Sequence, residues 1–190
     1  MKIVKISSLE VLDSRGRPTL CTRVHLEDGN VGTALVPSGA STGKLEAHEL
    51  RDGDNSRYKG LGTITAAKNA ESSIEILDDI DSEDQQTIDE KLIEFDGTKN
   101  KSNIGANAVL SVSLACAKAT AKSLNTPLHE YLNIVYKNIS GKDSSMSVPT
   151  PMLNIMNGGC HANNDVDIQE FMIIPSNKFS FKEGLMRSVE

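Results

Sequence analysis

Residues 36–44 form a run of small and hydroxylated side chains whose chemistry suits ligand binding. Gly39 and Gly43 permit backbone angles that other residues avoid. The hydroxyl groups near them, with unpaired amides, would bind an anion or an oxygen-seeking metal ion; they belong to Ser38, Ser41 and Thr42. The composition leaves two interpretations open, a mobile lid over a site and an ordinary connector.

The pair Gly43-Lys44 also invites comparison with a phosphate-binding P-loop. That motif has four residues between its glycines and a Ser or Thr after its lysine. Here three residues separate Gly39 from Gly43, and Leu45 follows Lys44. We therefore exclude a P-loop.

Glu170 and His161 are the candidate ligand-binding side chains of the carboxy-terminal part. In a strand predicted over residues 166–174, Glu170 shares a side with apolar residues, where a carboxylate is costly unless it is paired or binds a ligand. The alternative is a Glu on an edge strand that reaches solvent. His161 follows Gly158 and Gly159, which let a ligand approach the backbone. Taken by itself, this His is equally compatible with a core position.

An antiparallel sheet is predicted for the first 36 residues, because alternating patterns over residues 20–26 and 31–36 flank the turn signal Asp28-Gly29. Helices are predicted from Thr63 to Leu77, from a capping box of Ser82 and Gln85 to Asp96, and over residues 106–124. The last helix is apolar on most sides and should be buried. Cys116 is then a small core residue instead of a reactive thiol.

A polar linker at residues 141–147 separates two predicted domains, residues 1–141 and residues 142–190. The second begins with apolar strands over residues 148–156 and 166–174. Phe171 to Ile174 is apolar on both faces, as expected for a strand inside a barrel that helices cover.

The composition excludes several functional classes. A net charge of -6 without a basic cluster argues against a nucleic-acid partner, and no apolar run is long enough to span a membrane. The first residues do not resemble a signal peptide, so we expect a cytoplasmic protein. The three cysteines have neither a close pairing nor a metal-ligand spacing, which predicts free thiols.

Several motifs, in the same order along the chain, resemble the enolase family. They are Asp13-Ser-Arg-Gly16, Val36-Pro-Ser-Gly-Ala-Ser-Thr-Gly43, Glu49-Leu-Arg-Asp-Gly-Asp54, and Asn157-Gly-Gly-Cys-His-Ala162 followed by Asp167-Ile-Gln-Glu-Phe-Met172. The resemblance covers essentially all 190 residues. It implies an α+β capping domain, made of a three-stranded antiparallel sheet followed by helices, and the first part of an enolase-type α/β (TIM-like) barrel.

Enolases are glycolytic lyases that interconvert 2-phosphoglycerate with phosphoenolpyruvate and water. The resemblance implies Mg²⁺ as cofactor, because two such ions can stabilise the negative charge that builds up while a lysine removes a proton. Carried over by position, Ser41 is implied to ligate the second Mg²⁺ from a lid loop of Ser38, Gly39, Ala40, Ser41 and Thr42. His161 is implied to contact the substrate, and Gln169 and Glu170 to line the pocket near the departing hydroxyl.

The sequence departs from the family at several positions. Cys160 stands where Ser or Glu is usual, and Arg17 stands where Asn is usual. Enolases are typically homodimers, and the family commonly has Arg at the position of Leu9 and Glu at that of Cys21, each paired with a charge across the interface. A homodimer of this protein is therefore predicted to be weakened unless the partner charges have changed too.

Nothing in the sequence matches the family's proton-donating Glu, the three carboxylates that hold the first Mg²⁺, or the base lysine. A barrel of this type needs roughly 250 residues. We therefore expect the catalytic groups to lie beyond residue 190 and the chain to be an amino-terminal enolase fragment. The alternative function is that of a binding or assembly module that is catalytically inactive alone.

Overall fold

The computed structural model describes residues 1–39, 43–159 and 162–190. Contacts between residues divide the chain into two compact units, Met1–Asp143 (unit 1) and Ser144–Glu190 (unit 2), which we describe separately. The assignment of residues 1–141 and 142–190 to two domains stays a prediction.

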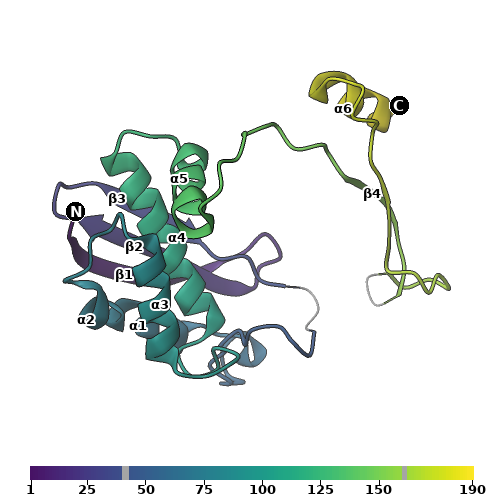
Figure 1. The fold of residues 1–190 in the computed structure, drawn as a ribbon. Helices are drawn as coiled ribbons and strands as arrows, with labels where there is room; N and C mark the ends of the chain where they lie inside the picture. Colours follow the sequence, from purple (N-terminus) through teal and green to yellow (C-terminus); the bar gives the residue numbers. More distant parts are fainter. Residues whose placement is uncertain (40–42, 160–161) are drawn as a thin grey trace. The chain divides into compact units, whose positions relative to one another are not determined.

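Unit 1 begins with a three-stranded antiparallel sheet in the order β1-β2-β3 (Figure 1). Its strands are β1 (Ile3–Leu12), β2 (Pro18–Leu26) and β3 (Val31–Leu35). One face of β2 is fully buried, and the residues on it are Leu20, Thr22, Val24 and Leu26. This confirms the hairpin predicted from the alternating pattern, since successive side chains of a strand point to opposite faces.

Helices cover the inner face of this sheet (Figure 1). The helices that contact the strands are α1 (Ile64–Ser72), α2 (Ile74–Leu77) and α4 (Ala106–Ser123). The other two, α3 (Gln85–Asp96) and α5 (Leu128–Ser140), pack on α4, and a 3₁₀ turn η1 (Tyr58–Gly60) precedes all five. The prediction of one helix from Thr63 to Leu77 was wrong in detail, because α1 ends at Ser72 and α2 starts after Ser73. The helix α5 was not predicted from the sequence.

The predicted capping box of Ser82 and Gln85 was also wrong. Asp84 is the N-cap of α3, and its Oδ1 accepts a hydrogen bond from Thr87 N at 3.0 Å. Ser82 is instead fully buried. Asp84 therefore caps the helix in place of Ser82. Its negative charge also interacts favourably with the positive end of the helix dipole.

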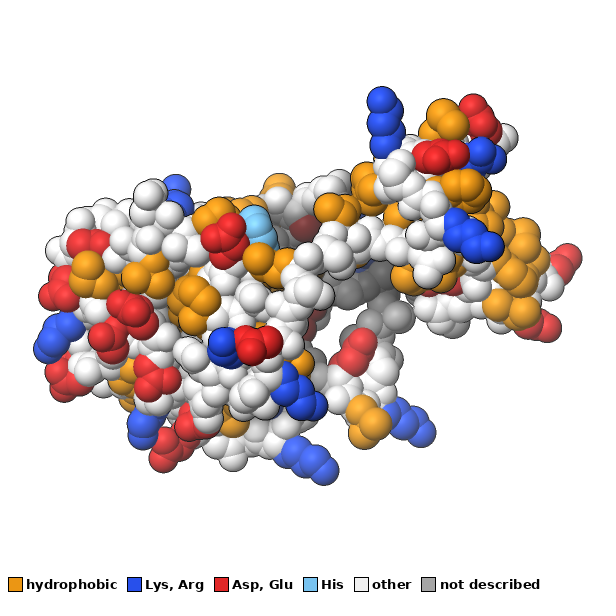
Figure 2. Space-filling view, turned by 45° about the horizontal axis from the view of Figure 1, so that its top comes forward, with side chains coloured by type: hydrophobic (Ala, Val, Ile, Leu, Met, Phe, Trp, Pro, Cys, Tyr) orange, Lys and Arg blue, Asp and Glu red, His pale blue; other side chains and the backbone are white. Residues whose placement is uncertain are grey.

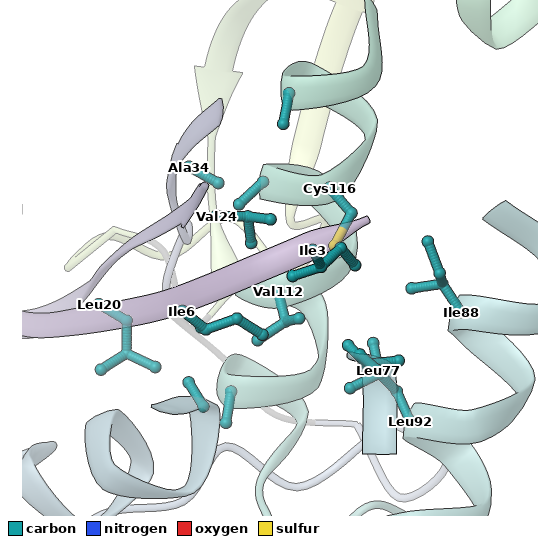
Figure 3. Packing of buried hydrophobic residues seen from close by; sticks show 14 of the residues in the cluster. Ile3, Ile6, Leu20, Val24, Ala34, Leu77, Ile88, Leu92, Val112 and Cys116 are labelled. Atoms are coloured by element: carbon teal, nitrogen blue, oxygen red, sulfur yellow. The ribbon is translucent and has the colours of Figure 1, made fainter. Parts of the chain in front are cut away.

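The core of unit 1 lies between the sheet and its helices, with α4 packed on β2 and β3 and α1 packed on β1. Figure 3 shows Val24 and Ala34 of the sheet facing Val112 and Cys116 of α4. Cys116 is fully buried, and this burial raises the pKa of its thiol to about 12, so the thiol stays protonated and inert. The prediction of a core cysteine is confirmed.

Unit 2 consists of a hairpin and a helix. Strands β4 (Leu153–Asn157) and β5 (Glu170–Ile173) pair antiparallel, and α6 (Phe181–Val189) starts after the N-cap Ser180. The predicted strand over residues 166–174 is thus shorter than expected, and Val166 and Ile168 precede it. Among the described residues of unit 2, Gly158 and Gly184 are the buried positions. Its large apolar side chains are exposed or half-buried, and Figure 2 shows orange side chains of this kind at the molecular surface.

Candidate functional site

Ser38, the first residue of the predicted lid loop, is held by hydrogen bonds on both its side chain and its backbone. Its Oγ accepts from Arg51 Nη2 at 3.0 Å and donates to Glu49 Oε2 at 3.2 Å. Its carbonyl oxygen accepts from Arg15 Nη2 at 2.6 Å. We call Ser38, Glu49 and Arg51 the loop base. It fixes the point at which the predicted lid leaves the sheet.

Arg51 is the centre of the loop base, because its guanidinium reaches four acceptors. Besides Ser38 Oγ, it donates to Glu49 Oε1 at 2.6 Å, to Pro18 O at 2.6 Å and to Leu61 O at 2.8 Å. The side chain is 18% exposed, so these bonds satisfy a largely buried cation. Arg51 and Glu49 were not predicted as site residues. The available signal was the pair of opposite charges two residues apart.

The segment that carries Glu49 and Arg51 is attached to the start of α4. His48 N donates to Asn100 O at 2.6 Å, and Ala106 N donates to His48 O at 2.8 Å. The Asn107 side-chain amide accepts a hydrogen bond from Leu50 N and donates one to Leu50 O, each at 3.1 Å. Since α4 is buried and central, these hydrogen bonds hold the segment against the core and restrict the position of the loop base.

A cavity of about 590 Å³ lies beside the loop base within unit 1. Ser38 and Gly39 line it, together with Arg17, His48, Glu49 and Asn100. This lining offers cationic and neutral donors as well as a carboxylate. The cavity could therefore accept a small polar molecule.

Several predicted site residues lie outside the described residues. These are Ala40, Ser41 and Thr42 of the lid loop and His161 of the second loop, and the neighbouring Cys160 lies outside the described residues too. The structure therefore leaves the roles of Ser41 and His161 as predictions. Ser38 and Gly39 are described and lie at the loop base.

Gln169 and Glu170 lie in unit 2, where the second loop rejoins the hairpin. Glu170 is half-buried at the first position of β5 and pairs with Asn157 of β4. The Gln169 carbonyl oxygen accepts from Gly158 N at 3.0 Å, and Gly159 N donates to Val166 O at 2.7 Å. The two glycines thus pair with the backbone of the segment that leads into β5.

Close packing against the backbone of Val166 and Ile168 explains why residue 158 is a glycine. A Cβ at this position would lie 2.3 Å from Val166 O and 2.5 Å from Ile168 O, which no side chain tolerates. The backbone of the loop makes this close approach. This close backbone approach is therefore sufficient to explain a glycine at position 158, without a ligand.

The described residues do not make a Mg²⁺ site by themselves. Within residues 1–39, 43–159 and 162–190, no three His, Cys, Asp or Glu side chains gather as cation ligands. Both carboxylate oxygens of Glu49, at the loop base, are engaged by Arg51 and Ser38. In the same described ranges, no helix has the length and apolar character to cross a membrane.

Two family descriptions match the chain. The first, "Enolase, N-terminal domain", matches residues 3–132, which is more than half of the chain. The second, "Enolase, C-terminal TIM barrel domain", matches residues 145–190. The first match covers the sheet and the helices up to the start of α5, and the second covers the hairpin and α6.

Proposed function

Since this chain belongs to the enolase family, a family of lyases, we propose that it serves the Mg²⁺-dependent glycolytic interconversion of 2-phosphoglycerate with phosphoenolpyruvate and water. The sheet and helices of unit 1 are the family's capping domain, and the second match is the beginning of its TIM barrel domain. The loop base is the observation that best supports the proposal, because a lid that closes over a site must be attached at a rigid position. Ser38 with its Arg51, Glu49 and Arg15 contacts provides that point.

The residue roles of this proposal follow the family positions. Ser41 is the proposed Mg²⁺ ligand of the lid loop, His161 the proposed substrate contact, and Gln169 and Glu170 the proposed lining of the pocket near the departing hydroxyl. Glu170 begins a short strand, which restricts its backbone and so helps to position a carboxylate. The described residues provide no complete Mg²⁺ ligand set, so we assign no catalytic step to them.

Homodimers and a cytoplasmic location are part of the proposal, since both are usual for the family. Leu9 and Cys21 are direct partners in the β1–β2 register, and the Leu9 side chain is 65% exposed. The proposed dimer therefore has an apolar pair where relatives have two charges. We propose that this weakens the dimer.

The second candidate function is that of an inactive module, in which the 190-residue polypeptide binds or assembles without turning over substrate. The exposed apolar side chains of unit 2 favour it, because a hairpin and one helix whose described residues bury no side chain gain stability by packing against another surface. The sequence also has no match to the family's base lysine. Loss of a general base costs about 10² to 10⁴ in rate.

One experiment tests both candidates. The 190-residue polypeptide is purified free of host enolase, and phosphoenolpyruvate formation from 2-phosphoglycerate is followed with Mg²⁺, both alone and after addition of a separately purified enolase barrel. The expected result is no turnover alone and turnover on mixing. The barrel without this polypeptide is the control. Turnover by the polypeptide alone would exclude the inactive module, and no turnover in the mixture would count against the enzymatic role.

A further inference from the structure

Asn157 and Gly158, at the end of β4, form the single Asn-Gly pair of the sequence. Asparagine is a thermolabile residue, and it reacts most readily when glycine follows it. In this reaction the backbone nitrogen of the following residue attacks the side-chain amide carbon, and a glycine, which has no Cβ, leaves that approach open. The pair therefore has the chemistry of a spontaneous modification site.

The fold does not allow another residue in place of Gly158. A Cβ there would lie 2.3 Å from Val166 O and 2.5 Å from Ile168 O. Both oxygens are backbone atoms, so no change of side-chain rotamer relieves the contact. The protein therefore keeps a glycine after Asn157, and with it the reactive pair.

The closed β4–β5 hairpin protects the pair through its hydrogen bonds. Gly158 N donates to Gln169 O at 3.0 Å, so the attacking nitrogen is engaged. Asn157 Oδ1 accepts from Asn154 Nδ2 at 2.6 Å, and the Asn157 backbone oxygen accepts from Asn164 Nδ2 at 3.0 Å. Attack needs a free Gly158 nitrogen and a side-chain amide turned towards it. The strands must therefore separate before the reaction.

Few interactions within unit 2 oppose this separation. The two strands have five and four residues, and an isolated two-stranded hairpin is only marginally stable in water. The apolar side chains of Ile155, Met156, Met172 and Ile173 are each at least 42% exposed. Opening the hairpin therefore exposes little further apolar surface, and its free energy is at the low end of the range for local unfolding.

We propose that Asn157 is a deamidation site whose reaction is controlled by opening of the β4–β5 hairpin. In the open hairpin, Gly158 N gives its proton to a base in the solvent and forms a bond to Asn157 Cγ, and the former side-chain nitrogen leaves as ammonia. Water then hydrolyses the resulting succinimide at one of its two carbonyl groups, which yields aspartate or isoaspartate. The net change replaces one ammonia by one water.

The products weaken the hairpin that controls the reaction. Asn157 stands directly opposite Glu170 in the register of the two strands. Aspartate at position 157 brings a second carboxylate to this pair, and like charges directly opposite each other destabilise a sheet. Isoaspartate adds a carbon atom to the backbone and so disturbs the register. Deamidation therefore keeps the modified hairpin open.

The test follows the whole polypeptide by peptide mapping with mass spectrometry during incubation in mildly alkaline buffer, with and without urea. We expect Asn157 to deamidate in buffer at a rate within about tenfold of its rate in urea, because the reaction tracks the open fraction of a marginally stable hairpin. Stronger protection in buffer would overturn the proposal. Asn154 is the internal control, since it is exposed on the same strand but is followed by Ile155. Conversion of Asn154 as fast as Asn157 would also overturn it.

Hydrogen exchange tests whether hairpin opening is the controlling step. The Gly158 amide, followed by NMR, should show about the same protection as the deamidation rate does, since one opening frees this nitrogen for both reactions. A strongly protected Gly158 amide together with fast deamidation would contradict control by opening.

Asn157→Gln is the matched variant for the assignment of the site. Glutamine keeps the amide but has to close a larger ring, so the peptide that contains residue 157 should no longer gain the mass of deamidation. An undiminished mass gain in that peptide would place the reaction at another residue and overturn the proposal.

Discussion

Arg51 Nη2 lies 3.0 Å from Ser38 Oγ and, at the same time, 2.6 Å from Glu49 Oε1. One guanidinium nitrogen thus joins the start of the predicted lid loop to the segment that α4 holds in place. The other terminal nitrogen of Arg51, Nη1, donates hydrogen bonds to the carbonyl oxygens of Pro18 and Leu61. The position of Ser38 therefore depends on a cation whose four acceptors come from four places in the sequence.

Arg51→Gln should weaken unit 1 more than an ordinary surface change. A glutamine cannot reach all four acceptors, and it leaves Glu49 without its cation, so we expect a loss of about 1–3 kcal/mol in unfolding free energy. Urea denaturation measures it. Arg23→Gln, an exposed arginine of β2, is the matched control and should behave like the unchanged protein. Equal denaturation midpoints for the two variants would refute the role of the loop base.

Gly32→Ala should disturb the contact between β3 and α4. A Cβ at Gly32 would lie 2.0 Å from Ala115 O and 2.4 Å from Ala119 N, both of which are helix backbone atoms that cannot move aside locally. Overpacking of this kind costs about 1–3 kcal/mol or more. Thr33→Ala, next along the strand and half-buried, is the control. A Gly32→Ala variant as stable as this control would contradict the tight contact between β3 and α4.

Asp96 should make unit 1 sensitive to acid. Its carboxylate is 2% exposed and accepts from the Thr98 hydroxyl and from the backbone amides of Thr98, Asn103 and Ile104, the last at 2.7 Å. Burial opposes ionisation, but these donors together hold the pKa of Asp96 below its usual value of 3.8. The resulting stability is present above this ordinary value and is lost as the pH falls through the lowered pKa.

Asp96→Asn should therefore cost about 2–3 kcal/mol near neutral pH, because an amide nitrogen cannot accept from these donors. The difference from the unchanged protein should shrink as the pH falls below about 4, where the native carboxylate also becomes protonated. Unfolding free energies across this pH range measure it. Asp79→Asn, on an exposed side chain, is the control. A difference that stays constant at every pH would contradict the assignment.

Ser41→Ala should lower turnover and weaken the use of the second Mg²⁺ in the polypeptide combined with an enolase barrel. The proposed role gives this hydroxyl one oxygen contact with the metal, so its loss should raise the Mg²⁺ concentration needed for half-maximal rate. Ser14→Ala, in the exposed β1–β2 turn, is the control. If turnover and its Mg²⁺ dependence are those of the control, the metal assignment fails.

The proposed homodimer should respond to charges at Leu9 and Cys21. In the combined protein, Leu9→Arg together with Cys21→Glu should tighten self-association if the barrel supplies the charges usual in the family. Sedimentation at several protein concentrations measures the dimer fraction. Lys5→Glu, on the same strand, controls for a general effect of charge. A tight dimer before any substitution, with a barrel that keeps the partner charges usual in the family, would contradict the predicted weakening.

The sequence determined the sheet, the buried helix α4 and the family. Period-two alternation in β2 and the long apolar pattern of residues 106–124 depend on which side chains avoid water, and this preference is a local property of the residues. Motifs such as Asp13-Ser-Arg-Gly16 and Val36–Gly43 identified the family, because their order along the chain needs no knowledge of contacts. The helix α5 was missed although Leu128, Tyr131 and Val135 recur at helical spacing, and these residues pack together against α4.

The tertiary structure decided which of several plausible polar residues bind one another. Ser82 and Asp84 both suit an N-cap, and packing buried the first and left the second at the helix end. Arg51 has the same charge as Arg23, yet it meets Ser38, Glu49, Pro18 and Leu61 because strand, loop and helix converge around it. Hydrogen bonds between residues far apart in sequence follow from the position of the backbone in space. A linear pattern carries no information on that position until the core has formed.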